Sequence, residues 1–234
     1  MNLYIFQKGF NYSQDGPGNR LVYHLSGCSL SCPWCSNPEG KDRCTGTSVS
    51  VDALVGEAVS AMPMFFDGGG VTLTGGEVTE QFEAVKALLT ALKEKGIHTC
   101  IETNGVSPRL PELSPLVDYL IMDVKHPEDA AHQRVIGVSN RHVLANLKAL
   151  QGRQLAVRIP LVGGFNDRYA EAFAQLLQGL PITVEVLRYH EYGRDKYAAL
   201  GLPYPMTEAA RISDETYRDF TQILKTAGIQ LVNT

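Results

Sequence analysis

Three cysteines, Cys28, Cys32 and Cys35, lie close together in one short segment that also contains the only tryptophan of the chain. Thiolates are the ligands that iron-sulfur clusters require, and three of them on one loop can hold three irons of a four-iron cluster. The fourth iron would keep an open position, at which the amine and carboxylate of a small molecule can bind. The spacing therefore predicts a 4Fe-4S cluster with one exchangeable corner.

A structural zinc site is the alternative use of the same cysteines, with Cys44 or His24 as the fourth ligand. Structural zinc loops usually pair two ligands closely and take a second pair from elsewhere in the chain. The sequence contains no second Cys-x-x-Cys or His pair, and its five cysteines are an odd number. This pattern favours metal binding in a reducing compartment over a disulfide framework and favours the cluster over zinc, although spacing alone leaves both metals open.

The composition is that of a chain that can bury one core, with 234 residues of which 44% are hydrophobic. We expect a single domain over residues 1–234. The net charge of −4 comes with interleaved acidic and basic residues, so nucleic acid is not an expected partner. No stretch has the length of a membrane span and the N-terminus lacks the pattern of a signal peptide. The chain is expected to be cytoplasmic and not associated with a membrane.

Short apolar runs alternate with stretches of helical periodicity along most of the chain. Strands are predicted at residues 21–25, 71–73, 98–101, 119–124, 156–161 and 183–189. Helices are predicted at 78–92, ending before Gly96, and from the N-cap Ser213 to Gly228, with further helices at 51–62, 142–150 and 169–177. This alternation predicts an α/β fold with a parallel sheet, either open and doubly wound or curled into a barrel.

Glycines and polar residues follow the ends of the predicted strands. Since parallel strands end at one edge of a sheet, these residues are expected to form the functional site. They occupy positions 27–28, 74–77, 102–105, 123–125, 158–160 and 189–190. Asp123 and Lys125 alternate around Val124, so both charges should point the same way into a largely buried region, where charges need partners. An ordinary surface ion pair is the alternative for these two residues.

The sequence resembles the glycyl-radical-enzyme activating enzymes of the radical S-adenosylmethionine (SAM) superfamily. The resemblance includes the Cys-x-x-x-Cys-x-x-Cys loop with an aromatic residue before its third cysteine, and it continues in the same order through nearly the whole chain. Its further motifs lie at residues 15–20 (Asp-Gly-Pro-Gly-Asn-Arg), 37–39, 69–77, 102–105, 123–125, 132–140, 158–160, 189–193 and 196–197. Many members carry a ferredoxin-like insert after the cysteine loop. Only residues 40–50 intervene here, so the chain resembles the minimal, single-cluster form.

The resemblance implies an α/β fold of the partial (β/α)6 TIM-like barrel type and a single 4Fe-4S cluster held by the three cysteines. It implies an oxidoreductase that cleaves SAM reductively at the cluster and removes a hydrogen atom from a glycine Cα in a partner, the glycyl radical enzyme. Flavodoxin or ferredoxin is the implied reductant. One alternative is a radical SAM enzyme for another peptide or a small molecule, and a second is a non-catalytic zinc-binding protein.

The resemblance also implies roles for individual residues. The implied SAM contacts are Trp34, Ser36, Asn37, Gly76, Glu102, Asp123, Val124, Lys125 and His190. Among them, Gly76 would hold the methionyl amine, Lys125 the carboxylate and His190 the adenosine. A monovalent cation would lie at Glu102, Thr103 and Asp123, although this chain has Glu102 where a well-known member has aspartate. Asp15 would gate entry of the partner's loop, and Cys44 and Cys100 match no cluster position.

Overall fold

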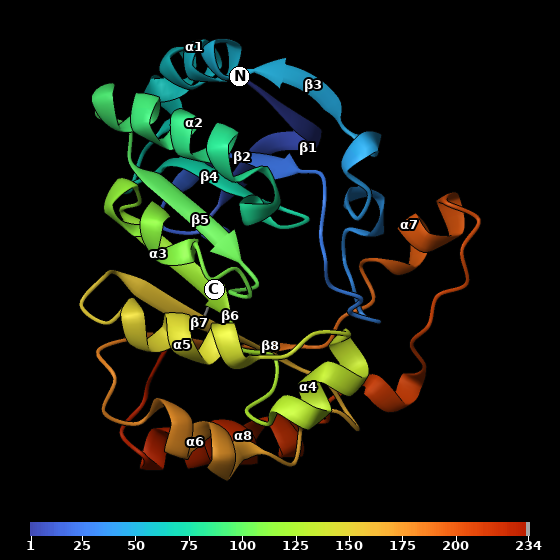
Figure 1. Cartoon of the computed structure of the whole chain (residues 1–234). Coiled ribbons are helices and arrows are strands. Elements are labelled where there is room, and N and C mark those ends of the chain that lie inside the picture. Colours follow the sequence, from blue (N-terminus) through green and yellow to red (C-terminus); the bar gives the residue numbers. More distant parts are fainter. Residues whose placement is uncertain (233–234) are drawn as a thin grey trace. The chain divides into compact units, whose positions relative to one another are not determined.

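Strands and helices alternate along most of the computed structural model, which describes residues 1–232 (Figure 1). The strands are β1 (Asn2–Tyr12), β2 (Asn19–Leu25), β3 (Thr47–Ser50), β4 (Gly70–Gly75), β5 (Thr99–Thr103), β6 (Tyr119–Asp123), β7 (Leu155–Leu161), β8 (Thr183–Arg188) and β9 (Gln230–Val232). The helices are α1 (Val51–Ala61), α2 (Phe82–Glu94), α3 (Leu110–Leu113), α4 (Asp129–Ile136), α5 (Arg141–Ala149), α6 (Ala170–Leu177), α7 (Arg194–Ala199) and α8 (Asp214–Thr226). All six predicted strands and all five predicted helices are confirmed.

The sheet has the strand order β3-β1-β2-β4-β5-β6-β7-β8-β9 and is open. The pairs β2–β4, β4–β5, β7–β8 and β8–β9 are parallel, which confirms an α/β fold with a mostly parallel sheet. At one edge, outside the six predicted strands, β1 pairs antiparallel with both β2 and β3. Only residues 13–18 connect β1 to β2. That link suits a hairpin, whereas a parallel crossover needs about a dozen residues or more.

Contacts divide the described chain into two units. The first unit comprises residues 1–29, 39–103 and 107–121, and the second comprises residues 30–38, 104–106 and those from 122 onward. Cys28 belongs to the first unit, and Cys32 and Cys35 belong to the second. The single domain over residues 1–234 stays a prediction, and its last two residues lie outside the described residues.

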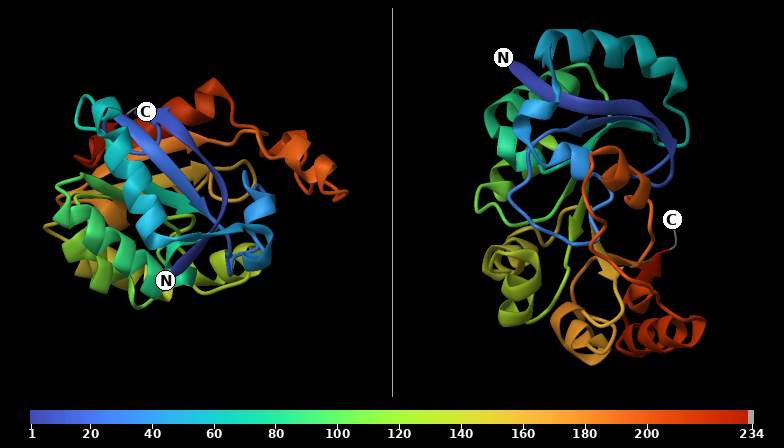
Figure 2. Two further views of the ribbon diagram at one scale, coloured as in Figure 1. Left: turned by 90° about the horizontal axis from the view of Figure 1, so that it is seen from above. Right: turned by 90° about the vertical axis from the view of Figure 1, so that its right-hand side faces the viewer.

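Each unit buries its own apolar side chains. In the first unit α1 packs against α2 (Figure 2). Leu88, Leu89 and Leu92 of α2 are fully buried. In the second unit α6 packs against α8 (Figure 2). The rings of Phe173 and Phe220 meet edge to face there, with centroids 5.7 Å apart. The predicted helix boundaries have the expected caps: the Ser213 hydroxyl accepts a hydrogen bond from the Thr216 N–H at 3.1 Å.

Helices α4 and α7 were not predicted because neither has an apolar stripe. The buried side of α4 includes His132 and Ala131 beside Ile136, and α7 buries only Tyr197. Periodicity cannot identify helices whose buried positions are this few or this polar. Among residues 1–232, the helices are all too short or too polar to cross a lipid bilayer.

Candidate functional site

The base of the cysteine loop is fixed within the first unit, directly after β2. Gly27 donates its N–H to the Gly40 carbonyl at 2.8 Å, and Cys28 donates its own to the Lys41 carbonyl at 3.1 Å. Gly27 has a φ of 102°, a conformation that residues other than glycine rarely adopt. The start and the end of the loop are therefore tied together, and the backbone of Cys28 is held at the junction.

The end of β4 packs directly on this base. Gly76 donates its N–H to the Leu25 carbonyl at 2.7 Å, and the Glu77 N–H donates to the Gly27 carbonyl at 2.7 Å. A methyl group on Gly76 would lie 2.2 Å from the Gly27 carbonyl oxygen and 2.8 Å from that of Gly40. Position 76 thus requires glycine because the backbone of the cysteine loop occupies the space. The sequence did not reveal this contact, and the role of Gly76 in holding the SAM amine stays a prediction.

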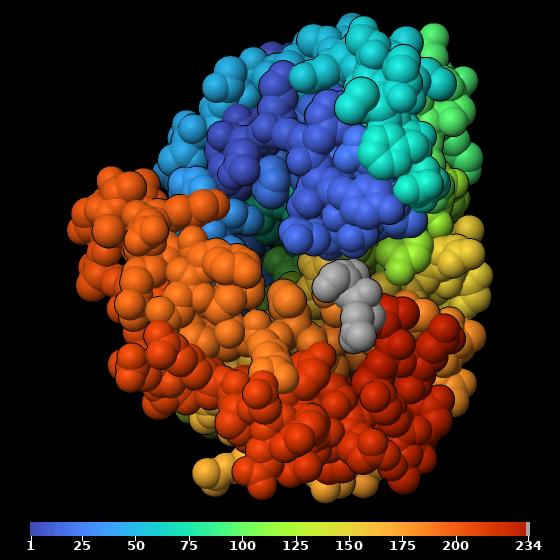
Figure 3. Space-filling view, turned by 180° about the vertical axis from the view of Figure 1, so that it is seen from behind, coloured from blue at the N-terminus to red at the C-terminus, as the bar shows by residue number. Residues whose placement is uncertain are grey.

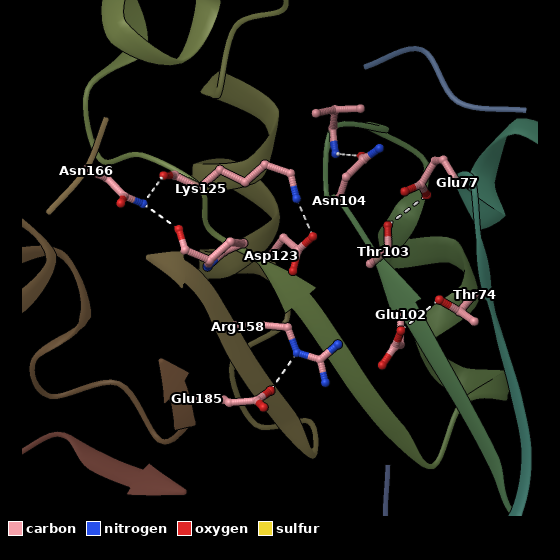
Figure 4. Close-up of polar contacts among 12 residues, drawn as sticks. Thr74, Glu77, Glu102, Thr103, Asn104, Asp123, Lys125, Arg158, Asn166 and Glu185 are labelled. Carbon is pink, nitrogen blue, oxygen red and sulfur yellow. Dashed lines mark hydrogen bonds and ion pairs between the residues drawn. The ribbon is translucent and has the colours of Figure 1, made fainter. Parts of the chain in front are cut away.

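The ends of β4 and β5 are joined by two hydrogen bonds between side chains (Figure 4). Thr103 donates its hydroxyl to the Glu77 carboxylate at 2.8 Å, and Thr74 donates to the Glu102 carboxylate at 2.7 Å. Glu77 is 1% exposed, and it also accepts from the N–H and the hydroxyl of Thr79. Glu102 and Thr103 therefore both lie in the polar network at the carboxyl ends of the strands, as their position in the sequence predicts.

Asp15 lies in a turn that a buried arginine holds in place. The Asp15 carbonyl accepts from the Thr72 hydroxyl at 2.7 Å, and its carboxylate accepts from Asn11 at 2.5 Å. Arg20 is fully buried and donates to the Thr72 hydroxyl at 2.6 Å and to the Pro17 carbonyl at 2.9 Å. Burial lowers the pKa of the Arg20 guanidinium. The hydrogen bonds to backbone carbonyls and to the Thr72 hydroxyl solvate the charge of Arg20. Because Pro17 and Asp15 are linked to Arg20 and Thr72 in this way, Arg20 anchors the turn of residues 15–18.

The rest of the cysteine loop belongs to the second unit. The Cys35 N–H donates to the Cys32 carbonyl at 3.3 Å, which closes a turn between these two cysteines. Trp34 packs against Phe165 with ring centroids 4.9 Å apart. Asn37 accepts a hydrogen bond from Lys196 at 2.8 Å, and Ser36 is half-buried between Cys35 and Asn37. Aromatic packing and side-chain hydrogen bonds thus order residues 32–37.

Asp123 and Lys125 form an ion pair at the end of β6, in which the Lys125 side chain is 7% exposed (Figure 4). The two charged side chains lie on the same side of the segment, as their alternation around the buried Val124 predicts, and they pair with each other. The segment is fixed by a hydrogen bond from the Val124 N–H to the Arg158 carbonyl at 2.9 Å and by one from Asn166 to the Lys125 carbonyl at 2.8 Å. A mostly buried ammonium group is therefore held beside the Asp123 carboxylate.

Two further groups of the second unit follow β7 and β8. The Arg158 side chain donates to Glu185 on the neighbouring strand at 2.6 Å, and both side chains are largely buried (Figure 4). His190 stacks on Tyr192 with ring centroids 4.0 Å apart. Its Nδ1 atom is buried and has no hydrogen-bond partner among the described residues. Burial also lowers the pKa of His190, so the neutral imidazole is favoured.

The donor set fits an iron-sulfur cluster. Cys28, Cys32 and Cys35 supply three thiols on a loop with a fixed base, and thiolates are the usual ligands of such clusters. Among the described residues, no three Cys, His, Asp or Glu side chains are already placed as a complete metal site. The agreement between this site and an iron-sulfur cluster therefore depends on the chemistry of the three thiols and on the glycine contacts that fix the loop.

Protonation of buried histidines is expected to destabilise the protein without its cofactors. Burial lowers the pKa of His98, His126 and His132 in the folded state. The unfolded chain then binds more protons than the folded chain below the unfolded pKa of about 6.5. The free energy of unfolding should thus be fully maintained above that pH. It should fall as the pH drops toward and through the lower pKa values that the histidines have in the folded state. Urea unfolding from about pH 7.5 to 5 measures this effect. A constant midpoint over that range would contradict it.

Comparisons with known proteins agree with this geometry. The family model of the radical SAM superfamily matches residues 22–177. The chain is 34% identical to the pyruvate formate-lyase 1-activating enzyme of Escherichia coli strain K12, over 92% of each chain. It is 30% identical to the isethionate sulfite-lyase activating enzyme of Nitratidesulfovibrio vulgaris, over 87% of this chain and 89% of that one. In fold, it resembles a radical SAM methyltransferase from Sphaerobacter thermophilus, with a TM-score of 0.67 and 21% identity over 96% of this chain and 72% of the other.

Proposed function

Because the chain belongs to the radical SAM superfamily, we propose that it is an activating enzyme that installs a glycyl radical on a partner enzyme. The observation that carries this proposal is the 34% identity with a pyruvate formate-lyase activating enzyme, which extends over 92% of both chains. The cofactors of the superfamily, a 4Fe-4S cluster and SAM, are those of this chain. A relationship of this length extends far beyond the cysteine loop.

The three cysteines would hold the cluster through their thiolates. When bound, the cluster and SAM supply a one-electron cleavage that generates a radical able to abstract hydrogen from carbon. The contact between Gly76 and the carbonyls of Gly27 and Gly40 keeps the base of the loop rigid. In the second unit, the packing of Trp34 on Phe165 fixes the position of the indole ring between Cys32 and Cys35 in the sequence.

The proposed SAM contacts are Trp34, Ser36, Asn37, Gly76, Glu102, Asp123, Val124, Lys125 and His190. Lys125 supports this assignment because it is a largely buried ammonium group, and an ammonium group is a charge-assisted hydrogen-bond donor to carboxylates. His190 supports it because a neutral, half-buried imidazole with an unpartnered Nδ1 presents both a flat apolar face and a polar atom. These two side chains suit the carboxylate and the adenosine of SAM respectively.

A monovalent cation at Glu102, Thr103 and Asp123 remains part of the proposal. The Thr103 hydroxyl donates to Glu77, and the Glu102 carboxylate accepts from Thr74. Each oxygen keeps lone pairs after making these bonds, and hard cations bind oxygen ligands. The hydrogen bonds orient the side chains of both residues.

The proposed partner is a glycyl radical enzyme, with flavodoxin or ferredoxin as the reductant in the cytoplasm. Asp15 is the proposed gate for the partner's glycine loop, and the Arg20 anchor supports this role by giving the turn a defined conformation. The two relatives activate different lyases by name.

The test is activation of a candidate lyase by the anaerobically reconstituted protein. Protein with restored iron and sulfide is incubated with SAM, dithionite and pyruvate formate-lyase, and the mixture is examined by electron paramagnetic resonance. A doublet signal of a glycyl radical that depends on SAM is the expected result. Cleavage of SAM without a radical on this or on any other glycyl radical enzyme tested would contradict the activase role and favour a different peptide or small-molecule substrate.

A further inference from the structure

Residues 162–169 of the second unit connect β7 to α6, and this connection is closed by its own hydrogen bonds. The N–H groups of Phe165 and Asn166 both donate to the Val162 carbonyl, at 3.1 and 3.2 Å, and the Tyr169 N–H donates to the Asn166 carbonyl at 3.1 Å. The Val162 N–H in turn donates to the side-chain oxygen of Asn166 at 2.8 Å. We call residues 162–169 the β7 loop, and these internal bonds favour a single conformation for it.

The side chain of Asn166 is fully buried and ties the β7 loop to the segment that follows β6. Its amide nitrogen donates to the Lys125 carbonyl at 2.8 Å (Figure 4) and to the Pro160 carbonyl at 2.7 Å. Together with the bond from Val162, these contacts engage both N–H groups and the oxygen of the amide. The backbone of Lys125 is thus held by a side chain whose own orientation is fixed on every side.

Phe165 connects the β7 loop to the cysteine loop. Its ring packs against Trp34, with centroids 4.9 Å apart, and against His126, with centroids 5.0 Å apart. His126 is 1% exposed, and a second ring of the β7 loop, that of Tyr169, meets it at 4.3 Å. Since Trp34 belongs to the turn of two cluster cysteines and His126 follows Lys125 directly, the Phe165 ring is in contact with both of these segments.

We propose that Asn166 and Phe165 are positioning residues for the binding of SAM. Asn166 fixes the backbone that places the Lys125 ammonium for the SAM carboxylate, and Phe165 fixes the turn of Cys32 and Cys35 through Trp34. Binding groups need such support, because a site becomes ineffective when its side chains move by more than about 0.5 Å. The inference rests on the proposed function, which takes Lys125 as a SAM contact, and deepens it by naming residues that act through Lys125 and Trp34.

Replacement of Asn166 tests the first role. Asn166→Ala loses both bonds to carbonyls and should weaken SAM binding about 10-fold, less than the roughly 100-fold that a misplacement of 1 Å can cost. Equilibrium dialysis with anaerobically reconstituted, unreduced protein measures the dissociation constant without cleavage of SAM. Iron content should stay at the wild-type level. Asn166→Asp keeps the shape of the side chain and can donate at most one of the two bonds, so it should also weaken SAM binding and provides a second variant where alanine prevents folding.

A double variant shows whether Asn166 acts through Lys125. Lys125→Met should weaken SAM binding by itself, and Asn166→Ala should then add little, since the effects of coupled residues are not additive. An unchanged dissociation constant in iron-loaded Asn166→Ala or Asn166→Asp, or a full 10-fold effect in the Lys125→Met background, would overturn the role of Asn166. Wild-type affinity of Lys125→Met would contradict the SAM contact of Lys125 itself, and this inference with it.

The second role is tested by the rate at which a chelator removes iron. Phe165→Leu loses the ring that packs on Trp34 and should release iron about 10-fold faster, at the lower end of the range for outer-shell changes. Phe165→Tyr keeps an aromatic ring and should release iron slowly.

Phe173→Leu is the matched control, because that ring packs on Phe220 of α8, the helix whose residues are red on the face shown in Figure 3. Its rate of iron release should be that of the wild type. Equal rates in the wild type and in Phe165→Leu, or equally fast release from Phe173→Leu, would overturn the role of Phe165. No partner enzyme enters these measurements, so failure of this inference is distinct from failure of the activase proposal.

Discussion

Cys32→Ser is expected to lose the cluster and, with it, the reductive cleavage of SAM. A serine hydroxyl is a poor ligand for iron, and the remaining two thiols cannot hold the three irons that the loop must bind. Outer-shell changes already cost 10–100-fold in metal affinity, so loss of a direct ligand should lower SAM cleavage by more than about 100-fold. Iron and sulfide analysis of the reconstituted protein, together with its colour, measures cluster content directly.

Cys44→Ser is the matched control for this change. Cys44 is exposed and lies in the short turn of residues 43–45 after the loop. Its replacement should leave iron content and SAM cleavage at the wild-type level. Loss of the cluster in Cys44→Ser, or its retention in Cys32→Ser, would mean that the ligands have been assigned incorrectly.

Gly76→Ala is expected to have the second-largest effect, although it adds only one methyl group. The new Cβ atom would lie 2.2 Å from the Gly27 carbonyl oxygen, and backbone atoms cannot rotate away as a flexible side chain can. Overpacking of this kind costs about 1–3 kcal/mol in the free energy of unfolding. Because Gly27 precedes Cys28, the displacement should also lower the retention of iron by about 10-fold, as other changes around metal ligands do.

Gly56→Ala provides the control for adding the same methyl group elsewhere. Gly56 lies within α1, and a Cβ atom there would have no neighbour within 4 Å. Since alanine favours helix more than glycine does, this variant should gain up to about 1 kcal/mol of stability and keep the cluster. Chemical denaturation and iron content measure both variants. A Gly76→Ala protein with wild-type stability and iron content would contradict the contact between β4 and the loop.

Local patterns in the sequence were sufficient to predict much of the fold and of the site. The six predicted strands and the two capped helices depend on short-range periodicity and on individual residues such as Ser213. The common direction of the Asp123 and Lys125 side chains follows from alternation along a single segment. In each case the residues that predict a feature lie within a few positions of the feature itself, so no knowledge of tertiary contacts was needed.

The features that sequence reasoning missed depend on distant residues or on weak local signals. The first strand, β1, has mostly exposed residues and is defined by its partners β2 and β3. Gln81 is 3% exposed and bonds to both backbone groups of Tyr4 and to the Ser26 carbonyl, contacts that span more than 50 positions. Lys196 and Asn37 are separated by 159 positions. Their sequence context gives no indication of these partners.

The central claim is that the loop of Cys28, Cys32 and Cys35 holds a cluster at which SAM is cleaved. The most direct test is the formation of 5′-deoxyadenosine by the anaerobically reconstituted protein in the presence of dithionite and SAM. The account predicts 5′-deoxyadenosine and methionine in equal amounts, a brown protein with about four irons per chain, and no product from Cys32→Ser. A colourless protein that retains zinc and yields no 5′-deoxyadenosine after iron and sulfide are restored would contradict it.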